Sequence, residues 1–313
     1  MSGLPATPTA CCLLTCVSLL TLSAIVMICQ AESPSFSFRP TFSAPQLAEN
    51  PDHSVECQCC REAPAALPFV SVVVVATSAA NWMDRRKRIR SQFPQNVALI
   101  KDSNNSALLK FAIGTRQLDK QVQSAAQHEA TEHKDILFFD CSDLDDGLNH
   151  LQNWHLGAGP SATTSKVMLS VQWAVQHYTF DFFFRLGDDS YFRVDRFLHL
   201  QSSGDFPMHN AVVGRMESGY VFDMQQTYPQ GAGYALTYDV CTFIAANTAY
   251  LMDTAPEDCV VARWLFALGA RFVHSPLWRD MSLGESCQED MVLAHKLSPG
   301  CWANIKHDGT VTC

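Results

Sequence analysis

The segment Gly187-Asp188-Asp189 places two carboxylates directly after a largely apolar run, Phe182–Leu186. An isolated carboxylate is costly to bury, so these two must be solvated, paired or bound to a cation. Carboxylate oxygens suit Mg²⁺ or Mn²⁺, which commonly takes one or two carboxylates together with the phosphates of a substrate. The segment is therefore a candidate metal site, and an ordinary Gly-Asp-Asp turn is the alternative.

A second candidate is the basic segment Asp84–Arg90, which holds five basic side chains in seven residues. Arg guanidinium groups match the oxygens of phosphates, so a helix carrying this segment at a ligand-binding edge could hold a diphosphate. The alternatives are a solvated basic face and Arg side chains buried in ion pairs with acidic residues. Charge alone leaves all three interpretations open.

Glu257 and Asp258 stand immediately before Cys259–Leu265, an apolar stretch with helical spacing. Acidic residues at the start of a helix commonly cap it and complement its dipole. A carboxylate in this position could instead take a proton from an attacking hydroxyl group. The pair is a candidate for either role.

One histidine adds to these candidates. His295 lies in the strand-like segment Met291–Leu297 near the end of the chain. A lone histidine is more often structural than a metal ligand, and His274 and His307 are rivals for any metal role. Histidine nitrogen is nevertheless a common ligand for metals of this kind.

Regular elements must position these residues, and the sequence alternates strands with helices. The run Phe69–Val75 is rich in β-branched residues and too apolar to alternate, as in a parallel strand buried on both faces. The segments after it predict, in order, a helix from Trp82, a strand at Leu108–Ile113 that Gly114 ends, a helix to about His133, a strand at Asp135–Asp140, a helix at Thr163–His177 and a strand at Phe180–Leu186. This alternation predicts an α/β fold with a central, mostly parallel sheet flanked by helices. Ligands of such sheets bind beyond the carboxyl ends of the strands.

The chain has 313 residues, and its N-terminal part differs in composition from the rest. Ala10–Cys29 is uncharged and long enough to cross a hydrocarbon core of ~30 Å. It predicts either a membrane anchor or a cleaved signal peptide within residues 1–31, and no Lys or Arg precedes it to set an orientation. Residues 32–67, rich in Pro, Ser and Ala, predict a stem, and residues 68–313 predict the folded domain.

Both interpretations of the N-terminus place the folded domain in an oxidising lumen, where disulfides persist. Nine cysteines follow Cys29. Since nine is odd, at least one is free, bridges two chains or lies in the tail. Disulfides are the default expectation, ahead of a zinc site at the Cys57–Cys60 CxxC.

The overall charge is acidic, with 22 Lys and Arg against 31 Asp and Glu and a formal net charge of −9. A protein of this balance, with a pI near 5.6, is not a general nucleic-acid binder. A hydrophobic content of 47% excludes a disordered polyampholyte.

Six segments, in order along roughly residues 70–300, resemble motifs of the β-1,3-galactosyltransferase family, the glycosyltransferase group that includes Fringe. They are Arg85–Phe93 (RRxxIRxxW in the family), Leu109–Gly114 (its second strand), Asp135–Leu137 (DIL), Arg185–Phe192 (KVDDDxFV), Tyr228–Tyr234 (YP...GxGY) and Glu257–Val261 (EDVxV). Gly187 stands where the family has the first Asp of its acidic triad.

The resemblance implies a GT-A fold and an inverting transfer from a UDP-sugar donor to a glycan acceptor, with Mn²⁺ at the diphosphate. By position it implies that Asp189 and His295 bind the metal and that Asp258 is the catalytic base. The residues that it assigns to the nucleotide are Thr77, Arg86, Arg90 and Asp188.

The implied activity is that of a hexosyltransferase that transfers galactose or N-acetylglucosamine in a β-1,3 linkage. The resemblance and the apolar segment together imply a single-pass type II protein of the Golgi membrane with a lumenal catalytic domain, or a secreted protein after signal cleavage. An inactive relative and a lumenal glycan-binding protein are the alternative functions.

Overall fold

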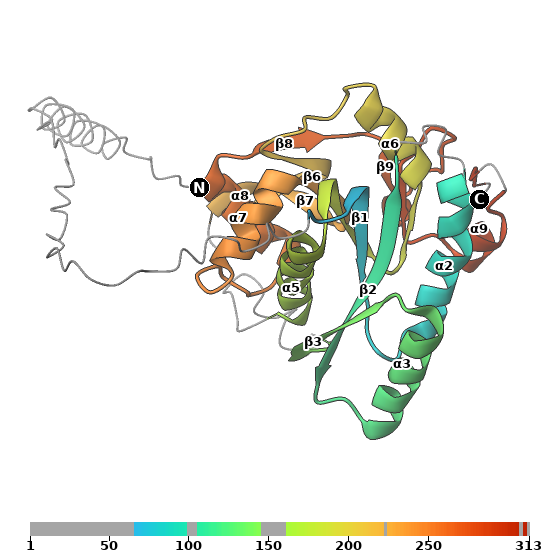
Figure 1. Cartoon of the computed structure of the whole chain (residues 1–313). Coiled ribbons are helices and arrows are strands. Elements are labelled where there is room, and N and C mark those ends of the chain that lie inside the picture. Colours follow the sequence, from blue (N-terminus) through green and yellow to red (C-terminus); the bar gives the residue numbers. More distant parts are fainter. Residues whose placement is uncertain (1–65, 99–104, 145–160, 222–223, 307–308, 312–313) are drawn as a thin grey trace, which may run out of the picture. The chain divides into compact units, whose positions relative to one another are not determined.

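A computed structural model of the chain describes residues 66–313 except for 99–104, 145–160, 222–223, 307–308 and 312–313 (Figure 1). All described residues belong to one unit, Ala63–Cys313. The predicted membrane or signal segment and nearly all of the predicted stem lie outside the described residues. Among the helices that the structure describes, none combines the length and the apolar character needed to cross a membrane.

Seven strands form the main sheet in the order β3-β2-β1-β4-β7-β6-β8. Their bounds are β1 Phe69–Thr77, β2 Ala107–Arg116, β3 Ile136–Ser142, β4 Thr179–Gly187, β6 Ala211–Val221, β7 Met224–Thr237 and β8 Arg271–His274. Strands β3, β2, β1 and β4 are parallel, whereas β7 is antiparallel to both β4 and β6. Strand β8 is again parallel to β6. The predicted α/β fold with a central, mostly parallel sheet is confirmed.

A second sheet brings the end of the chain to the acidic turn that follows β4. Its three short strands, in the order β5-β10-β9, are β5 Ser190–Phe192, β10 Leu293–His295 and β9 Trp278–Asp280. The antiparallel pairing of β10 with β5 sets His295 opposite Ser190. The parallel pairing of β10 with β9 sets His295 opposite Asp280. The histidine predicted as a ligand is therefore fixed beside the acidic turn by backbone pairing.

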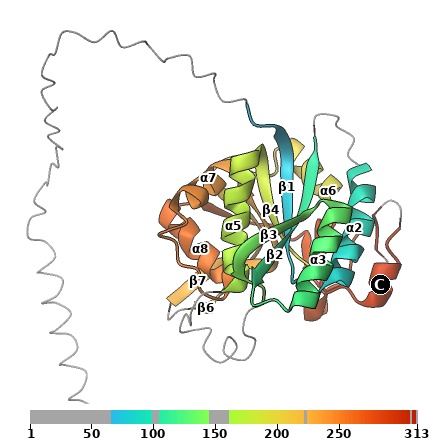
Figure 2. The same ribbon diagram turned by 60° about the horizontal axis from the view of Figure 1, so that its bottom comes forward.

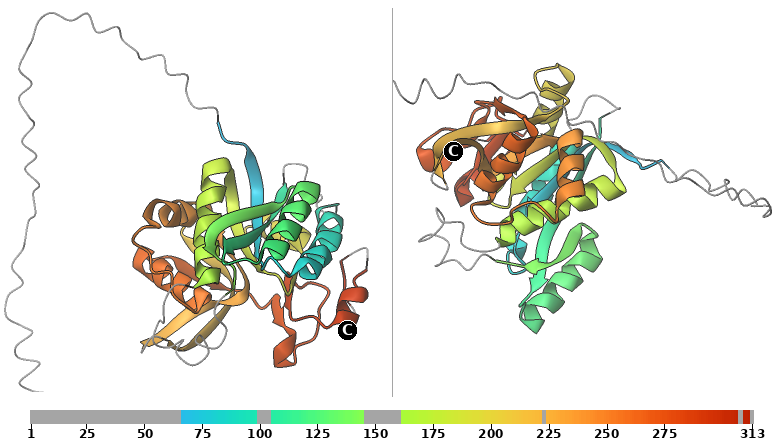
Figure 3. Two further views of the ribbon diagram at one scale, coloured as in Figure 1. Left: turned by 90° about the horizontal axis from the view of Figure 1, so that it is seen from below. Right: turned by 90° about the vertical axis from the view of Figure 1, so that its left-hand side faces the viewer.

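Helices cover both faces of the main sheet, as Figure 2 shows. One face carries α5 (Ala162–His177), α7 (Tyr238–Asn247) and α8 (Glu257–Leu268), and the other carries α2 (Met83–Ala98), α3 (Lys120–His133) and α6 (Val194–Ser202). Two short helices, η2 (Met281–Leu283) and α9 (Pro299–Ala303), belong to the C-terminal segment. Figure 3 shows the C-terminal segment, in red, at the edge of the domain, and Trp302 of α9 lines a small pocket together with Ile89 of α2. Trp302 of α9 packs edge to face on Tyr191, with the ring centroids 5.8 Å apart.

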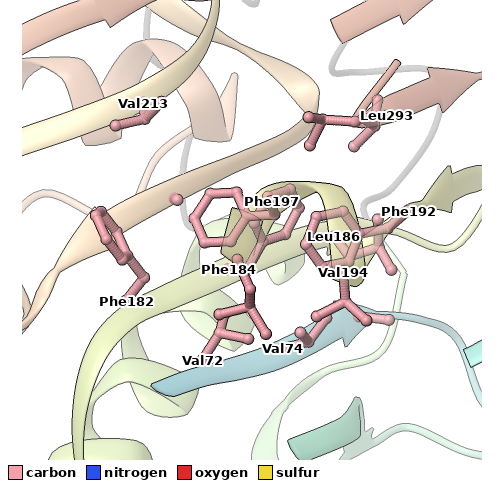
Figure 4. Packing of buried hydrophobic residues seen from close by; sticks show 14 of the residues in the cluster. Val72, Val74, Phe182, Phe184, Leu186, Phe192, Val194, Phe197, Val213 and Leu293 are labelled. Atoms are coloured by element: carbon pink, nitrogen blue, oxygen red, sulfur yellow. The ribbon is translucent and has the colours of Figure 1, made fainter. Parts of the chain in front are cut away.

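Strand β1 is buried on both faces, as its apolar run predicts. Val72 and Val74 point to the side of α2 and α6, and Val73 and Val75 point to the side of α5, α7 and α8. None of the four is more than 1% exposed. Figure 4 shows Val72 and Val74 packed with Phe184 of β4 in the first of these two layers. Full burial of one such side chain contributes about 1.5–3 kcal/mol, so β1 contributes strongly to the stability of the domain.

The prediction that Gly114 ends strand β2 is wrong, because the strand continues to Arg116. A Cβ atom on Gly114 would lie 2.2 Å from the carbonyl oxygen of Ser142 in β3. The glycine therefore permits a close approach between two strands, at the point where their register shifts. A glycine inside a strand often marks such an irregularity.

Three described cysteines, Cys141, Cys241 and Cys259, are free thiols, so the default expectation of disulfides is wrong for them. Cys301 is disulfide-bonded. Burial raises the pKa of the Cys141 thiol to about 11, which keeps it protonated. The Cys57–Cys60 CxxC lies outside the described residues.

Candidate active site

A cavity of about 700 Å³ opens at the carboxyl ends of β1 and β4, where ligands of α/β sheets bind. Its walls come from the loop after β1, the start of α2, the turn between β4 and β5, the middle of β7, the start of α8 and the ends of β9 and β10. Of the residues that the sequence singled out, this pocket brings together Thr77, Asp188, Asp189, Asp258 and His295. Thr77 is the last residue of β1 and is 9% exposed.

Asp188 lies on the wall of the pocket nearest α2 and is held from two sides. The hydroxyl of Ser78 donates a hydrogen bond of 2.9 Å to one carboxylate oxygen, and Arg85 Nη1 lies 2.9 Å from the other. Burial raises the pKa of Asp188, although both donors favour its charged form. The Arg85 guanidinium also stacks over the ring of Trp82, 4.1 Å from its centroid. Together these contacts present a pre-oriented, partly exposed cation at the pocket edge.

The next carboxylate in the turn, Asp189, faces His295. His295 Nε2 lies 3.5 Å from Asp189 Oδ1, and His295 Nδ1 lies 3.1 Å from Asp280 Oδ2. Burial alone would lower the pKa of His295 and raise that of Asp189, but their mutual attraction reverses both shifts. Burial alone would also raise the pKa of Asp280, but hydrogen bonds from Ser282 and His295 lower it to about 2. The Asp280 carboxylate therefore fixes the imidazole ring of His295 with Nε2 directed at Asp189.

The donor set at Asp189 and His295 suits a divalent cation with oxygen and imidazole ligands. In addition, Asp280 binds Nδ1 of His295 and so orients the ring, as carboxylates commonly do at metal-ligating histidines. Within the described residues, no group of three or more His, Cys, Asp and Glu side chains could hold a metal ion by itself. The pair could therefore supply two ligands, and a bound substrate would have to supply others.

Asp258, the second residue of α8, lies across the pocket. Its Oδ2 accepts a hydrogen bond of 3.0 Å from the backbone N–H of Gly231, and its Oδ1 accepts one of 2.9 Å from the N–H of Cys259. Burial raises the pKa of Asp258, while these donors and Arg185 favour the carboxylate. The carboxylate lines the pocket, so it can accept a proton from a ligand there.

Sequence reasoning missed a buried charge network beneath Asp258. Arg185 of β4, 6% exposed, donates to the carbonyl oxygen of Gly231 and lies 3.2 Å from the carboxylate of Glu257. Glu257 in turn accepts a hydrogen bond from the hydroxyl of Tyr234. Glu257 is thus a structural anchor for the start of α8, and its neighbour Asp258 is the residue that faces the pocket.

The assignment of Arg86 and Arg90 to the nucleotide is not supported, because neither residue lines the pocket. Arg86 is 0% exposed and forms a two-point ion pair with Glu129 of α3, with distances of 2.9 and 2.6 Å. Arg90 lies 2.6 Å from Glu129 and 2.7 Å from Asp135. These two arginines join α2 to α3 and to the start of β3. The alternative of buried ion pairs is the correct one for them, and the pocket instead receives Arg85.

Lys166 of α5 also lines the pocket. It is 4% exposed and donates to the backbone oxygens of Ser78 and Asp143 and to the Asp143 carboxylate, 3.2 Å away. Asp143 also accepts from the backbone N–H groups of Ala80 and Gly114. Lys166 therefore ties α5 to the loops after β1 and β3 that form the pocket wall.

Gly187, the last residue of β4, leaves room for its neighbours. A Cβ atom there would lie 3.0 Å from the carbonyl oxygen of Ala232 and 3.1 Å from Asp189 Oδ1. An aspartate at this position would have to displace the Asp189 carboxylate or the adjacent strand. The absence of a side chain at Gly187 therefore leaves the space that the Asp189 carboxylate occupies.

Comparison with curated proteins identifies relatives of one class. The chain is 24% identical over 253 residues to beta-1,3-galactosyltransferase 6 of Mus musculus, a match that covers 75% of this chain and 72% of that protein. It is 22% identical over 186 residues to UDP-GalNAc:beta-1,3-N-acetylgalactosaminyltransferase 2 of Xenopus laevis, covering 55% of this chain and 35% of the relative. It thus spans about a third of the second relative's length. No protein-family model matches the chain.

Among solved structures, similar chains include galactosyltransferase LgtC in complex with donor and acceptor sugar analogs, with 11% identity, a TM-score of 0.37, and coverage of 73% of this chain and 88% of that one. Mouse xyloside xylosyltransferase 1 matches with 11% identity and a TM-score of 0.38 over 72% of this chain and 97% of that one. Mannosyltransferase PcManGT from Pyrobaculum calidifontis, in complex with GDP-Man and Mn²⁺, matches with 13% identity and a TM-score of 0.36 over 68% of this chain and 56% of that one.

The sheet topology and the pocket at the carboxyl ends of its strands are those of an α/β fold that binds a ligand at this edge. The curated proteins that the chain resembles are glycosyltransferases, and the chain is similar to the β-1,3-galactosyl- and N-acetylgalactosaminyltransferases, as its motifs predicted.

Proposed function

We propose that the protein is a UDP-sugar-dependent β-1,3-glycosyltransferase that transfers galactose or N-acetylglucosamine to a hydroxyl group of a glycan acceptor with inversion. One observation carries the proposal: the Asp189–His295 pair and the carboxylate of Asp258 face the same pocket. The relatives are named as β-1,3-galactosyl- and β-1,3-N-acetylgalactosaminyltransferases, which supports this class of reaction.

The donor would occupy the side of the pocket formed by the ends of β1, β4 and β10. Asp189 and His295 would hold Mn²⁺, which stabilises negative charge on a departing diphosphate when it is bound. Arg85, fixed by Asp188 and Trp82, would contact the nucleotide or its phosphates in place of Arg86 and Arg90. Thr77 and Asp188 would border the nucleotide.

The acceptor would lie on the side of Asp258. During transfer, the acceptor oxygen forms a bond to the anomeric carbon as the bond to the diphosphate breaks, and the diphosphate leaves with the electron pair. Asp258 would take the proton of the acceptor hydroxyl, for which its raised pKa makes it a better base than an ordinary aspartate. Arg185 and Glu257 would keep the start of α8, and with it Asp258, in place.

The N-terminal segment completes the proposal. Residues 1–31 would be a signal-anchor and residues 32–67 a stem, so that residues 68–313 act in the lumen of the Golgi as part of a type II membrane protein. Cleavage of the same segment would give a secreted enzyme.

The test is a screen of the purified protein against a panel of UDP-sugars with Mn²⁺, read as UDP release with and without glycan acceptors. We expect UDP release from UDP-galactose or UDP-N-acetylglucosamine, and we expect a glycan acceptor to increase that release. No release from any UDP-sugar, in a preparation that binds UDP, would contradict the proposal and favour an inactive relative.

A further inference from the structure

The cations that line the pocket differ in whether they have acidic partners. Arg85, Lys166, Arg185 and His295 are each paired with a carboxylate of the protein. Lys296 also lines the pocket, is exposed, and takes part in none of the ion pairs formed among the described residues. It is thus a positive charge at the pocket that the described part of the protein leaves uncompensated.

The backbone holds Lys296 in an uncommon conformation. Its φ is 55°, in the left-handed region that side chains other than glycine seldom adopt. Its N–H donates a hydrogen bond of 3.2 Å to the carbonyl oxygen of Asp189, and the next residue, Leu297, is buried in the C-terminal core. Such a conformation costs free energy and persists only where the surrounding structure imposes it.

This placement joins Lys296 to both candidate metal ligands. Lys296 follows His295 in the chain, and its backbone N–H donates a hydrogen bond to the carbonyl oxygen of Asp189. A group that binds at this pair therefore lies beside Lys296, which lines the same pocket. With Asp188, Asp189, Asp258 and Asp280 all on the pocket wall, an anionic ligand needs such a cation to offset repulsion.

We propose that Lys296 binds the diphosphate of the UDP-sugar and neutralises part of the charge that this group gains on leaving. This inference rests on the proposed function and deepens it. The ammonium keeps its proton throughout, since the electron pair of the broken bond stays on the diphosphate and the proton of the acceptor goes to Asp258. Lys296 therefore acts by charge alone, and Arg can replace it in part.

The test compares Lys296→Met, which removes the charge at similar length, with Lys296→Arg, which keeps it. Binding of UDP and of uridine to the full chain is measured by calorimetry, both with Mn²⁺ and in EDTA. Lys296→Met should weaken UDP binding about tenfold in both conditions and leave uridine binding unchanged, while Lys296→Arg restores most of the affinity. Lys120→Met, an exposed lysine of α3 away from the pocket, is the control and should bind UDP as the wild type does.

Three results would overturn the inference. UDP binding by Lys296→Met equal to that of the wild type excludes the contact. An equal loss for UDP and uridine points to a general disturbance of the pocket, and a loss confined to Mn²⁺ points to the metal ligands. If the wild type releases UDP from a UDP-sugar in the same preparation, these results leave the proposed function standing. A wild type that binds no UDP at all overturns both.

Discussion

The backbone N–H of Gly231 in β7 donates a hydrogen bond of 3.0 Å to Oδ2 of Asp258 at the start of α8. Because Arg185 binds the carbonyl oxygen of the same glycine, one residue connects the buried charge network to the candidate base. The carboxylate is thereby fixed in direction without losing its capacity to accept a proton.

Replacing this carboxylate should abolish transfer and spare donor binding. Asp258→Asn removes the base, and we expect kcat to fall by about 10²–10⁴ while the affinity for UDP is unchanged. UDP release measures the first quantity and calorimetry the second. Asp205→Asn, an exposed position outside the pocket, should change neither. Loss of UDP binding in Asp258→Asn would remove the base assignment.

Two arginines of α2 offer a matched comparison for the diphosphate. Arg85 faces the pocket, whereas Arg88 is exposed elsewhere on the same helix. Arg85→Met should weaken UDP binding about tenfold and reduce its dependence on salt, because an Arg–phosphate contact is lost. Arg88→Met should bind UDP as the wild type does. Equal binding by both variants would show that Arg85 does not reach the nucleotide.

The contrast between Arg85 and Arg86 shows what the sequence could predict. Motif order identified the basic segment, and β-branched runs identified the buried parallel strands. Helical spacing also held a signal that went unused: Arg86, Ile89, Arg90 and Phe93 recur at i, i+3, i+4 and i+7, the pattern of a buried helix face. Arg85 falls outside that pattern and faces the pocket.

Other parts of the site carried no local signal. Asp280 reaches His295 only because β9 and β10 pair in parallel, and that pairing joins segments separated by a long loop. The ion pair between Arg185 and Glu257 likewise depends on how α8 packs beside β7 and β4. Contacts of this kind follow from tertiary packing, which spacing along the chain does not encode.

The bond between Asp280 and His295 predicts a variant that affects the metal. In Asp280→Asn the amide oxygen stays at Oδ1, where Ser282 donates to it, so the amide nitrogen takes the place of Oδ2. That nitrogen cannot accept from His295 or from Gln230, whose Nε2 lies 2.6 Å from Oδ2 in the wild type. We expect the Mn²⁺ concentration for half-maximal UDP binding to rise about 10–100-fold. Ser282→Ala removes only the hydrogen bond from its hydroxyl to the other oxygen, Oδ1, and keeps the one from its backbone N–H, so it should have a small effect. An unchanged Mn²⁺ requirement in Asp280→Asn would contradict the orienting role.

The buried ion pairs of Glu129 with Arg86 and Arg90 predict a large effect on stability. Glu129→Gln leaves two arginines without their anion, and removing one partner of a buried pair costs about 3–5 kcal/mol. Urea unfolding measures the change. Glu132→Gln alters a neighbouring residue of α3 whose side chain is 62% exposed, and it should change the free energy of unfolding by less than about 0.5 kcal/mol. Similar values for both variants would show that the ion pairs contribute little.

The same ion pairs predict how stability depends on pH. Burial alone would raise the pKa of Glu129, but the hydrogen bonds from Arg86 and Arg90 lower it below the ordinary value of 4.5. A depressed pKa means that the folded state binds fewer protons than the unfolded state, so the stabilisation is complete above pH 4.5 and is lost as the pH falls through the folded-state pKa. The difference in unfolding free energy between wild type and Glu129→Gln should therefore be constant from about pH 6 to pH 8 and shrink at more acidic pH. Glu132→Gln should show no such change, and a difference for Glu129→Gln that persists in acid would mean that charge is not the source of the stabilisation.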